Sequence, residues 1–485
     1  MIAVQLNKRD FEYDIHSLIR AFYPGMDVPV YQDGETEPEG YEKKLRVIYE
    51  EDSVEMTLLD GSGSVLEHDK RPVAYYEDRK ATKNLLKSML YEMLRSHTGR
   101  SLPWGNLTGI RPTKIPMALL EAGWKNSDIA QYMRNTYYTS NEKTALAIMI
   151  ANRERHILKD IDYENGYSLY VGIPFCPSIC AYCSFSSSPL SVWKNRVDDY
   201  LDALCKEIES CARIYEHRQL DTIYMGGGTP TTLEPYQMDR LLTKLEECFD
   251  RSHVKEFTVE AGRPDSITKE KLQVLRDHGI SRISINPQTM NQKTLDIIGR
   301  KHTVGETVEA FHLARSLGFD NINMDLIVGL PGEEYEQVEY TMKEVTALDP
   351  DSITVHSLAV KRAARLNMFR DEYKEMTFTN NQEIMDMTCR MAMAAGQFPY
   401  YLYRQKNMAG NFENVGYARP EAAGIYNILI MEEKQSILAL GAGATSKRVT
   451  VELIERADNV KDIKNYIARI DEMIERKRLL MEVNV

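Results

Sequence analysis

Three cysteines stand close together near the middle of this 485-residue chain: Cys176, Cys180 and Cys183, with the spacing C-x3-C-x2-C. Thiolates this close on one loop can bind an iron–sulfur cluster, but a [4Fe–4S] cubane has four irons and needs four ligands. One iron is therefore left without a protein ligand. Such an iron can bind a small molecule through its amine and carboxylate groups, so the spacing predicts a cluster with an open coordination site.

The same cysteines have three other interpretations: a disulfide pair, a structural zinc site or buried apolar side chains. Structural zinc needs four Cys or His ligands, commonly on paired C-x2-C arms, and the sequence has no second arm. The other cysteines lie singly in segments predicted to be helical, where a free thiol behaves as a small hydrophobe: Cys205, Cys211, Cys248 and Cys389. With few cysteines, no signal peptide and no apolar run long enough to cross a bilayer, we expect a reducing, cytoplasmic compartment.

The cysteines lie at the start of a region, Tyr167 to Ala359, in which short apolar strands alternate with amphipathic helices. This alternation is typical of a parallel α/β sheet. The predicted strands are Ser168–Ile173, Thr222–Met225, Glu256–Glu260, Arg282–Asn286, Ile322–Val328 and Ser352–His356. Chemically capable groups follow or end them in turn: the cysteines, the Gly-Gly-Gly-Thr-Pro-Thr run at 226–231, Glu260, Gln288, Asp325, and Ala359 with Lys361, Arg362 and Arg365. Because barrel enzymes build their sites at the carboxyl ends of the strands, we expect these groups to gather at one edge.

Two features of that edge have roles that follow from the residue types. Consecutive glycines let the backbone approach a ligand closely, and Thr229 adds a hydroxyl. The alternative is a tight strand-to-helix connection, and the run lacks the lysine of a phosphate-binding loop. Glu260 and Asp325 belong to buried strands, so each carboxylate must be exposed, paired or engaged with a cation. Asp325 has two possible roles: it accepts a hydrogen bond from a ligand, or it caps the local backbone.

These motifs resemble those of the oxygen-independent coproporphyrinogen III oxidase family of radical S-adenosylmethionine (SAM) proteins, the HemN/HemW/HemZ-like proteins. The chain is most similar to the HemZ-type coproporphyrinogen dehydrogenase branch, from Tyr167 to Arg365 and more weakly to Lys447. The resemblance implies that the three cysteines ligate a [4Fe–4S] cluster and act in catalysis. It also implies a set of SAM-binding positions: Tyr170, Tyr182, Gly227, Gly228, Thr229, Glu260, Gln288, Arg300, Asp325 and Ala359.

The resemblance further implies a fold and a reaction. The fold would be α/β, a partial (β/α)6 radical SAM barrel with an α+β amino-terminal domain and a small α/β carboxy-terminal extension. The reaction would be the oxidative decarboxylation of coproporphyrinogen III propionates to vinyl groups, giving protoporphyrinogen IX in haem biosynthesis, with flavodoxin or ferredoxin as electron donor. A substrate with four carboxylates needs positive charge, best from arginine. The candidates are Lys361, Arg362, Arg365, Arg404 and Lys406, although an amphipathic surface would explain them equally well.

Three departures from the family pattern bear on the substrate. Gly172 stands where the oxidases usually have His, Phe185 stands where they have a fourth Cys, and Thr445 stands where the haem-trafficking branch has His. Two alternatives to coproporphyrinogen oxidation therefore stay open. One is a haem-binding or haem-trafficking protein that retains the SAM-binding cluster, and the other is different radical chemistry on a tetrapyrrole.

Length and charge set the wider organisation. A chain of 485 residues is expected to form about three domains. We predict residues 1–165 as an amino-terminal domain of unknown role, 166–370 as the radical SAM barrel and 371–485 as a region that covers the substrate. The net charge of −12 argues against nucleic acid or an anionic membrane surface as the main partner.

Within residues 1–165 the pattern predicts both strands and helices. Apolar alternation over Lys44–Leu59 ends in the turn 60–63 and predicts paired strands, and helices are predicted at Arg79–Ser96 and at Asn141–Leu158, the latter capped by Thr139 or Ser140. Between the helices, the Gly- and Pro-rich segment Leu102–Lys114 is predicted to be a structured loop that caps the next helix. Its Arg111 and Lys114 offer an alternative role in anion binding.

Overall fold

The computed structural model describes residues 1–73, 76–109, 111–185, 187–359, 364–368, 370–373, 376–404, 412–450 and 453–482. The chain divides into two compact units, residues 1–152 and residues 153–485. In the described part of the chain, no helix combines the length and the apolar character needed to cross a membrane.

The first unit is an α+β domain built on a five-stranded sheet with the order β2-β1-β3-β4-β5. Its strands are β1 (Ile2–Leu6), β2 (Val30–Gln32), β3 (Lys43–Tyr49), β4 (Ser53–Asp60) and β5 (Val65–Pro72). Its helices are α1 (Glu12–Phe22), α2 (Arg79–Thr98), α3 (Lys114–Glu121), α4 (Asn126–Tyr137) and α5 (Asn141–Ile157), the last of which runs into the second unit. Alternate apolar side chains of β1, β3 and β4 pack against α1 and α2 to form one core.

The predicted local structure of this unit is confirmed. β3 and β4 pair antiparallel with Leu45 opposite Leu58. The predicted turn joins β4 to β5, because the Asp60 carboxylate accepts the backbone N–H groups of Ser62 at 2.8 Å and Ser64 at 2.9 Å. Helix α5 is capped by Ser140, whose Oγ accepts the Lys143 N–H at 3.2 Å.

The segment between α2 and α3 is the structured loop that the sequence predicted. Gly105 has φ of 54°, and a Cβ at this position would lie 1.9 Å from the carbonyl oxygen of Tyr137. The neighbouring Asn106 N–H donates to the same oxygen at 2.9 Å. The loop therefore packs against the end of α4 so closely that only glycine fits.

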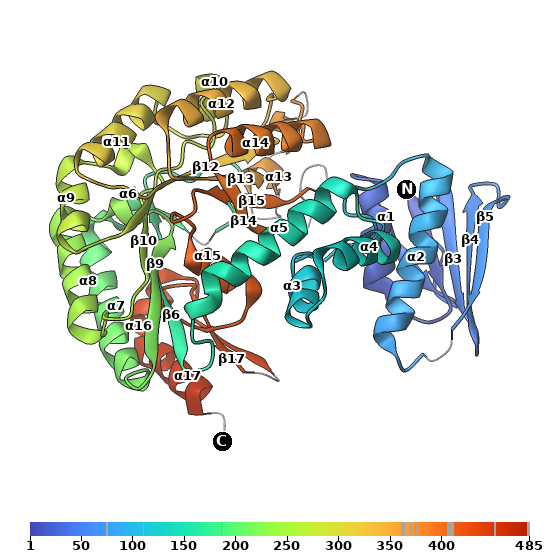
Figure 1. Ribbon diagram of the computed structural model, residues 1–485, viewed down its shortest axis with the longest axis horizontal. Coiled ribbons are helices and arrows are strands. Elements are labelled where there is room, and N and C mark those ends of the chain that lie inside the picture. The colour runs from blue at the N-terminus through green and yellow to red at the C-terminus, as the bar shows by residue number, and fades with distance from the viewer. Residues whose placement is uncertain are drawn as a thin grey trace. The chain divides into compact units, whose positions relative to one another are not determined.

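The second unit is built on an eleven-stranded sheet with the order β14-β15-β13-β12-β11-β10-β9-β6-β16-β17-β18 (Figure 1). Its central strands are β6 (Gly166–Ile173), β9 (Gln219–Gly227), β10 (Glu256–Glu260), β11 (Arg282–Ser284), β12 (Ile322–Val328) and β13 (Ser352–Ser357). These are the strands predicted from the sequence, and each pairs in parallel with its neighbour. Because β6 and β13 lie apart in the strand order, the barrel is open, as the predicted partial barrel requires.

Helices cover the outer face of this curved sheet (Figure 1). They are α7 (Val197–Ile214), α8 (Pro235–Cys248), α9 (Lys269–Asp277), α10 (Gln292–Ile297), α11 (Val304–Ser316) and α12 (Tyr335–Leu348). The strands are buried almost throughout, as expected for parallel strands covered on both faces. Short elements complete the connections: β7 (Phe175–Cys176), β8 (Ser188–Pro189), α6 (Leu190–Trp193), α13 (Arg365–Met368), and 3-10 turns at Leu158–Asp160, Lys194–Arg196, Pro230–Thr232, Pro264–Ser266 and Arg370–Tyr373.

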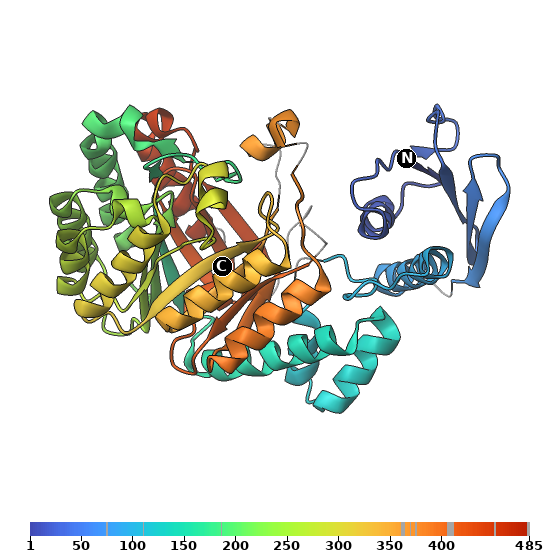
Figure 2. The same cartoon turned by 90° about the horizontal axis from the view of Figure 1, so that it is seen from above.

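The last part of the chain extends the sheet at both edges. The elements are α14 (Gln382–Ala394), β14 (Phe398–Tyr403), β15 (Asn414–Ala418), α15 (Ile425–Glu432), β16 (Ser436–Leu440), β17 (Thr445–Val449), β18 (Ile454–Asp458), α16 (Ile463–Ala468) and α17 (Ile470–Glu482). β15 runs antiparallel to β13, β16 runs parallel to β6, and α14 lies beside α12 (Figure 2). A fully buried ion pair fixes α17 to the barrel, since Lys477 Nζ lies 2.7 Å from Glu207 Oε1.

Candidate functional site

A cavity of about 360 Å³ opens at the carboxyl ends of the central strands. This volume lies in the range of small-molecule sites. The predicted groups that line it are Cys176, Cys180, Cys183, Tyr182, Gly227, Gly228, Thr229, Glu260, Gln288, Arg300, Asp325 and Ala359. The structure therefore brings together residues that end or follow each central strand, as the strand-end argument predicted.

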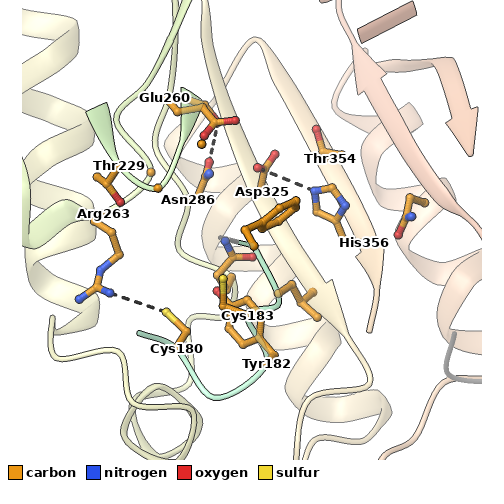
Figure 3. Close-up of a pocket in the computed structure, with 18 of the residues that line it drawn as sticks. Cys180, Tyr182, Cys183, Thr229, Glu260, Arg263, Asn286, Asp325, Thr354 and His356 are labelled. Carbon is orange, nitrogen blue, oxygen red and sulfur yellow. Dashed lines mark hydrogen bonds and ion pairs between the residues drawn. The ribbon is translucent and has the colours of Figure 1, made fainter. Parts of the chain in front are cut away.

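The cysteine loop forms one side of this cavity (Figure 3). Its two ends are joined by the short pairing of β7 with β8, and its middle is fixed because the Ala181 N–H donates to the Ile298 carbonyl at 2.9 Å. Thr229 Oγ1 lies 3.6 Å from Cys176 Sγ, and Arg263 Nη1 lies 3.6 Å from Cys180 Sγ. These donors face the sulfur atoms that a cluster would use, and such bonds stabilise thiolate charge.

Burial raises the pKa of the Cys176 and Cys183 thiols. Without a cation beside them these thiols stay protonated, and a bound metal centre removes the proton. Among the described residues, no three His, Cys, Asp or Glu side chains are grouped tightly enough to surround a single metal ion. The donor set of three thiols around one shared cavity fits a larger, thiolate-bound cluster.

Gln288 combines a strained backbone with an unsatisfied side chain. Its φ is 67°, unusual for a residue with a side chain, and β12 holds it there through the hydrogen bond from the Gln288 N–H to the Asp325 carbonyl at 3.0 Å. The side chain is 8% exposed, and its Oε1 has no hydrogen-bond partner among the described residues. A buried acceptor on strained backbone in a cavity fits a ligand that donates a hydrogen bond, as a hydroxyl or ammonium group of SAM does.

Glu260 and Asp325 have opposite ionisation behaviour. Burial raises the pKa of Glu260 to about 7, the charge of Asp325 adds to this rise, and the Tyr224 hydroxyl opposes it by donating to Glu260 Oε1 at 2.6 Å. Burial also disfavours the charged form of Asp325, but His356 and Asn323 outweigh this and lower the pKa of Asp325. The cavity is thus lined by one ionised carboxylate and one whose charge changes near neutral pH, and such a pair favours a cationic ligand.

Packing alone explains the glycines at the end of β9, Gly226 and Gly227, and Gly228 directly after it. A Cβ on Gly226 would lie 2.9 Å from the carboxyl carbon of Glu260, and a Cβ on Gly228 would lie 2.5 Å from the Phe175 carbonyl oxygen. Gly227 has φ of 110°. The run therefore lets Glu260 and the cysteine loop approach the strand, which adds a packing role to the predicted close approach of a ligand.

Arg300 holds the cysteine loop against the strand ends. Its guanidinium donates to the Tyr182 hydroxyl at 3.1 Å, to the Gly262 carbonyl at 2.8 Å and to the Asn286 carbonyl at 2.6 Å.

Tyr170 differs from the other predicted contacts, because it is not among the residues that line the cavity. Its ring stacks on Tyr224 at 6.3 Å, so a direct contact of Tyr170 with SAM stays a prediction.

Of the predicted substrate cations, the two that the structure describes, Arg365 and Arg404, do not line the cavity. Arg365 is exposed, and Arg404 is buried away from the cavity lining, with its pKa lowered by burial to about 10. Lys361, Arg362 and Lys406 lie outside the described residues. Among the described residues, the arginines that line the cavity are Arg263, Arg282 and Arg300.

Several lining residues were not singled out from the sequence: Tyr224, Arg263, Arg282, Asn323, Thr354 and His356. The alternation of a strand could have indicated some of them, since Thr354 and His356 are two residues apart on β13 and share one face. Tyr401 and Tyr403 also line the cavity, so part of the predicted aromatic segment 399–406 forms its wall. Tyr400 packs on the opposite side of β14, against α15.

The structure also shows the surroundings of the three residues that depart from the family pattern, Gly172, Phe185 and Thr445. Gly172 accepts the Tyr200 hydroxyl through its carbonyl at 2.6 Å, and a Cβ on it would lie 3.3 Å from the Leu440 carbonyl oxygen. Phe185 is 71% exposed and lines the cavity beside the cysteines. Thr445 donates to Asp458 Oδ1 at 2.5 Å within the β17–β18 pair.

Comparisons with known proteins agree with this geometry. Residues 170–345 match the radical SAM superfamily. The chain is 41% identical over 409 residues to the oxygen-independent coproporphyrinogen-III oxidase-like protein HemZ of Bacillus subtilis, covering 83% of this chain and 82% of that protein. It is 37% identical over 195 residues to the heme chaperone HemW of the same organism, covering 40% of this chain and 51% of that protein. Among solved structures, the coproporphyrinogen III oxidase HemN of Escherichia coli, a radical SAM enzyme, aligns with a TM-score of 0.53 and 27% identity, covering 64% of this chain and 70% of that one.

Proposed function

Because the chain belongs to the oxygen-independent coproporphyrinogen III oxidase-like family of radical SAM proteins, with HemZ, HemN and HemW among its relatives, we propose that it oxidises coproporphyrinogen III. The product is protoporphyrinogen IX, formed when two propionate side chains become vinyl groups. One observation supports this proposal most strongly: three thiols, a strained Gln288 and two carboxylates of different pKa line one cavity.

The three cysteines would hold the [4Fe–4S] cluster, and Glu260, Gln288 and Asp325, which line the same cavity, would hold SAM. When bound, this pair of cofactors supplies a carbon radical that removes a hydrogen atom from the substrate. The protein itself positions and shields the reacting groups. Arg263 and Thr229 donate toward the cysteine sulfurs, Arg300 fixes the loop, and Tyr401 and Tyr403 provide a flat apolar wall for the macrocycle.

An anaerobic assay tests this proposal. The purified protein is reconstituted with iron and sulfide and given SAM, coproporphyrinogen III, and a flavodoxin with its reductase and NADPH as the source of electrons. We expect a product whose mass is lower by two carboxyl groups and two hydrogen atoms, and no product from the Cys183→Ala variant. If the wild-type protein cleaves SAM but leaves coproporphyrinogen unchanged, the assignment of the substrate is wrong.

Haem binding is a second candidate, supported by the exposed Phe185 in place of a cysteine and by the similarity to HemW. Titration with haem distinguishes it, because a retained haem gives a shifted Soret band. Radical chemistry of another kind on a tetrapyrrole is a third candidate, supported by Gly172. The product mass decides between it and decarboxylation, since ring opening or methyl transfer does not remove carboxyl groups.

A further inference from the structure

Arg263 is a buried guanidinium that contacts the cysteine loop. It follows β10 and is 3% exposed. Its Nη1 donates to Cys180 Sγ at 3.6 Å, to the Ser178 carbonyl at 3.2 Å and to Ser178 Oγ at 3.2 Å (Figure 3). Thr229, the donor to Cys176, is neutral. Arg263 therefore brings a positive charge to one of the sulfur atoms that a cluster would use.

Asp265 binds the other edge of the same guanidinium. Nε of Arg263 donates to Asp265 Oδ1 at 2.9 Å, and Nη2 donates to Oδ2 at 2.7 Å. Such a two-point pairing fixes the plane of the guanidinium, and here it directs Nη1 toward Cys180. Burial disfavours the charged form of Asp265, but the hydrogen bonds and the charge of Arg263 outweigh this and lower the pKa of Asp265. The two side chains are therefore an ionised pair whose cation contacts the sulfur.

The chain after β10 holds the backbone of Arg263 in place. The Arg263 carbonyl accepts the Ser266 N–H at 2.9 Å and the Ser266 hydroxyl at 2.7 Å, within the 3-10 turn Pro264–Ser266. Ser266 Oγ also lies 2.7 Å from Thr231 Oγ1, which joins this turn to the one that follows β9. The guanidinium is thus presented to the cysteine loop from a turn that has its own hydrogen bonds to the barrel.

A buried cation beside a ligand sulfur changes the electrochemistry of a cluster. Reduction of [4Fe–4S]²⁺ to [4Fe–4S]⁺ adds one negative charge. A positive charge that donates to a ligand sulfur stabilises the reduced form more than the oxidised form, and hydrogen bonds to the sulfurs are among the factors that set the potential. Solvent screens the charge of Arg263 weakly, because the side chain is buried. Asp265 contacts only the far edge of the guanidinium, so its effect is opposite in sign and smaller.

We propose that Arg263, acting through Cys180 as a positioning residue, raises the reduction potential of the cluster held by the three cysteines, and that Asp265 limits this rise. This inference rests on the proposed function and adds a control of its first electron transfer. In that step one electron leaves a reduced electron-transfer protein of the flavodoxin or ferredoxin class and enters the cluster, and no bond forms or breaks.

Redox titration measures this potential without relying on turnover. The reconstituted full-length protein is poised at a series of potentials with dithionite and mediator dyes, without SAM, and electron paramagnetic resonance gives the fraction of reduced cluster. Arg263→Gln keeps an N–H donor but removes the charge. We expect at least about a tenfold lower ratio of reduced to oxidised cluster at the wild-type midpoint, which corresponds to a midpoint lower by about 59 mV. Arg263→Lys keeps the charge and should stay closer to the wild-type midpoint, and Asp265→Asn should raise the midpoint.

A matched control and a second readout separate tuning from support of the loop. Arg315 forms an equivalent pair with Asp351, with 2.7 Å between Nη1 and Oδ2, and neither residue lines the cavity. Arg315→Gln should therefore leave the midpoint unchanged. Iron and sulfide content is measured for every variant, because Arg263 also donates to Ser178 of the cysteine loop. A purely structural role lowers this content and does not give midpoint shifts of opposite sign in Arg263→Gln and Asp265→Asn.

Each remaining outcome supports or refutes the inference. Arg263→Gln with full iron content and an unchanged or raised midpoint refutes it and leaves the proposed function intact. If Arg263→Gln loses iron, Asp265→Asn decides: a raised midpoint supports the inference, and an unchanged or lowered one refutes it. Loss of iron in both variants means that the pair only holds the loop, which also refutes tuning. A wild-type protein that binds no cluster refutes the proposed function, and the inference with it.

Discussion

Glu154 gives the sharpest prediction about stability. It is completely buried in α5, and neither carboxylate oxygen has a hydrogen-bond partner among the described residues. Burial raises its pKa well above the ordinary value, and the nearby Glu432 of α15 raises it further, while Lys434 opposes the rise. We therefore expect Glu154 to be protonated in the folded protein at a pH at which it is ionised in the unfolded chain.

The sign of the pH effect follows from this difference. A carboxyl group whose pKa is raised by folding binds its proton more tightly in the folded state. Its favourable contribution is complete below the unfolded pKa of about 4.5 and is lost as the pH rises toward the folded pKa. The loss is about 1.4 kcal/mol for each pH unit in that window, so it reaches at most about 2.7 kcal/mol between pH 5 and pH 7.

The Glu154→Gln variant cannot ionise and escapes this loss. We expect the free energy of unfolding of Glu154→Gln, measured by urea unfolding, to increase relative to that of the wild-type protein as the pH rises from 5 to 7. Glu142→Gln on the same helix is the matched control. Because the pKa of the exposed Glu142 is lowered, it is ionised in both states over this range, and its difference from the wild type should stay constant. A Glu154→Gln difference that is equally independent of pH would refute the reasoning.

Three further predictions concern the site and its support. Gly226→Ala places a Cβ 2.9 Å from the Glu260 carboxyl carbon, and we expect the Kd for SAM to rise at least about tenfold in equilibrium dialysis. Tyr224→Phe removes a donor that favours the ionised form of Glu260, so the pKa of Glu260 should rise above about 7. As the pH falls, Glu260 of this variant should take up its proton at a higher pH than in the wild type, and SAM affinity should weaken at that higher pH. An unchanged pH midpoint of SAM affinity would contradict this. Glu207→Gln leaves Lys477 buried without its charge partner and should lower the free energy of unfolding by about 3 to 5 kcal/mol, measured by urea unfolding.

Local sequence patterns were enough to predict the parallel strands, and the family resemblance predicted the partial barrel. Each central strand is a short, largely apolar run with a Gly, Pro or polar residue at its end or within a few residues after it, and parallel strands place such ends at one edge. That is why Glu260, Gln288 and Asp325 could be grouped before the structure was known. The packing reason for Gly226 could not be predicted, since it depends on how closely Glu260 of the next strand approaches.

The side of the cavity that His356, Tyr401 and Tyr403 form depends on contacts that the spacing of residues in the sequence does not reveal. Tyr403 and His356 are 47 residues apart and meet only because β15 lies between β13 and β14. An antiparallel strand added after a barrel can join either edge, and the aromatic pattern of residues 398–403 does not say which. For the same reason Arg404 looked like a substrate contact, although the pleat turns it away from the cavity.

The central claim is that the three cysteines hold a cluster whose open iron binds SAM. Electron paramagnetic resonance of the reduced, anaerobically reconstituted protein tests it most directly. We expect a [4Fe–4S]⁺ signal that changes shape when SAM is added, and loss of the signal in the Cys180→Ala variant. A wild-type protein that retains no iron–sulfur cluster, or one whose signal is identical with and without SAM, would contradict the account.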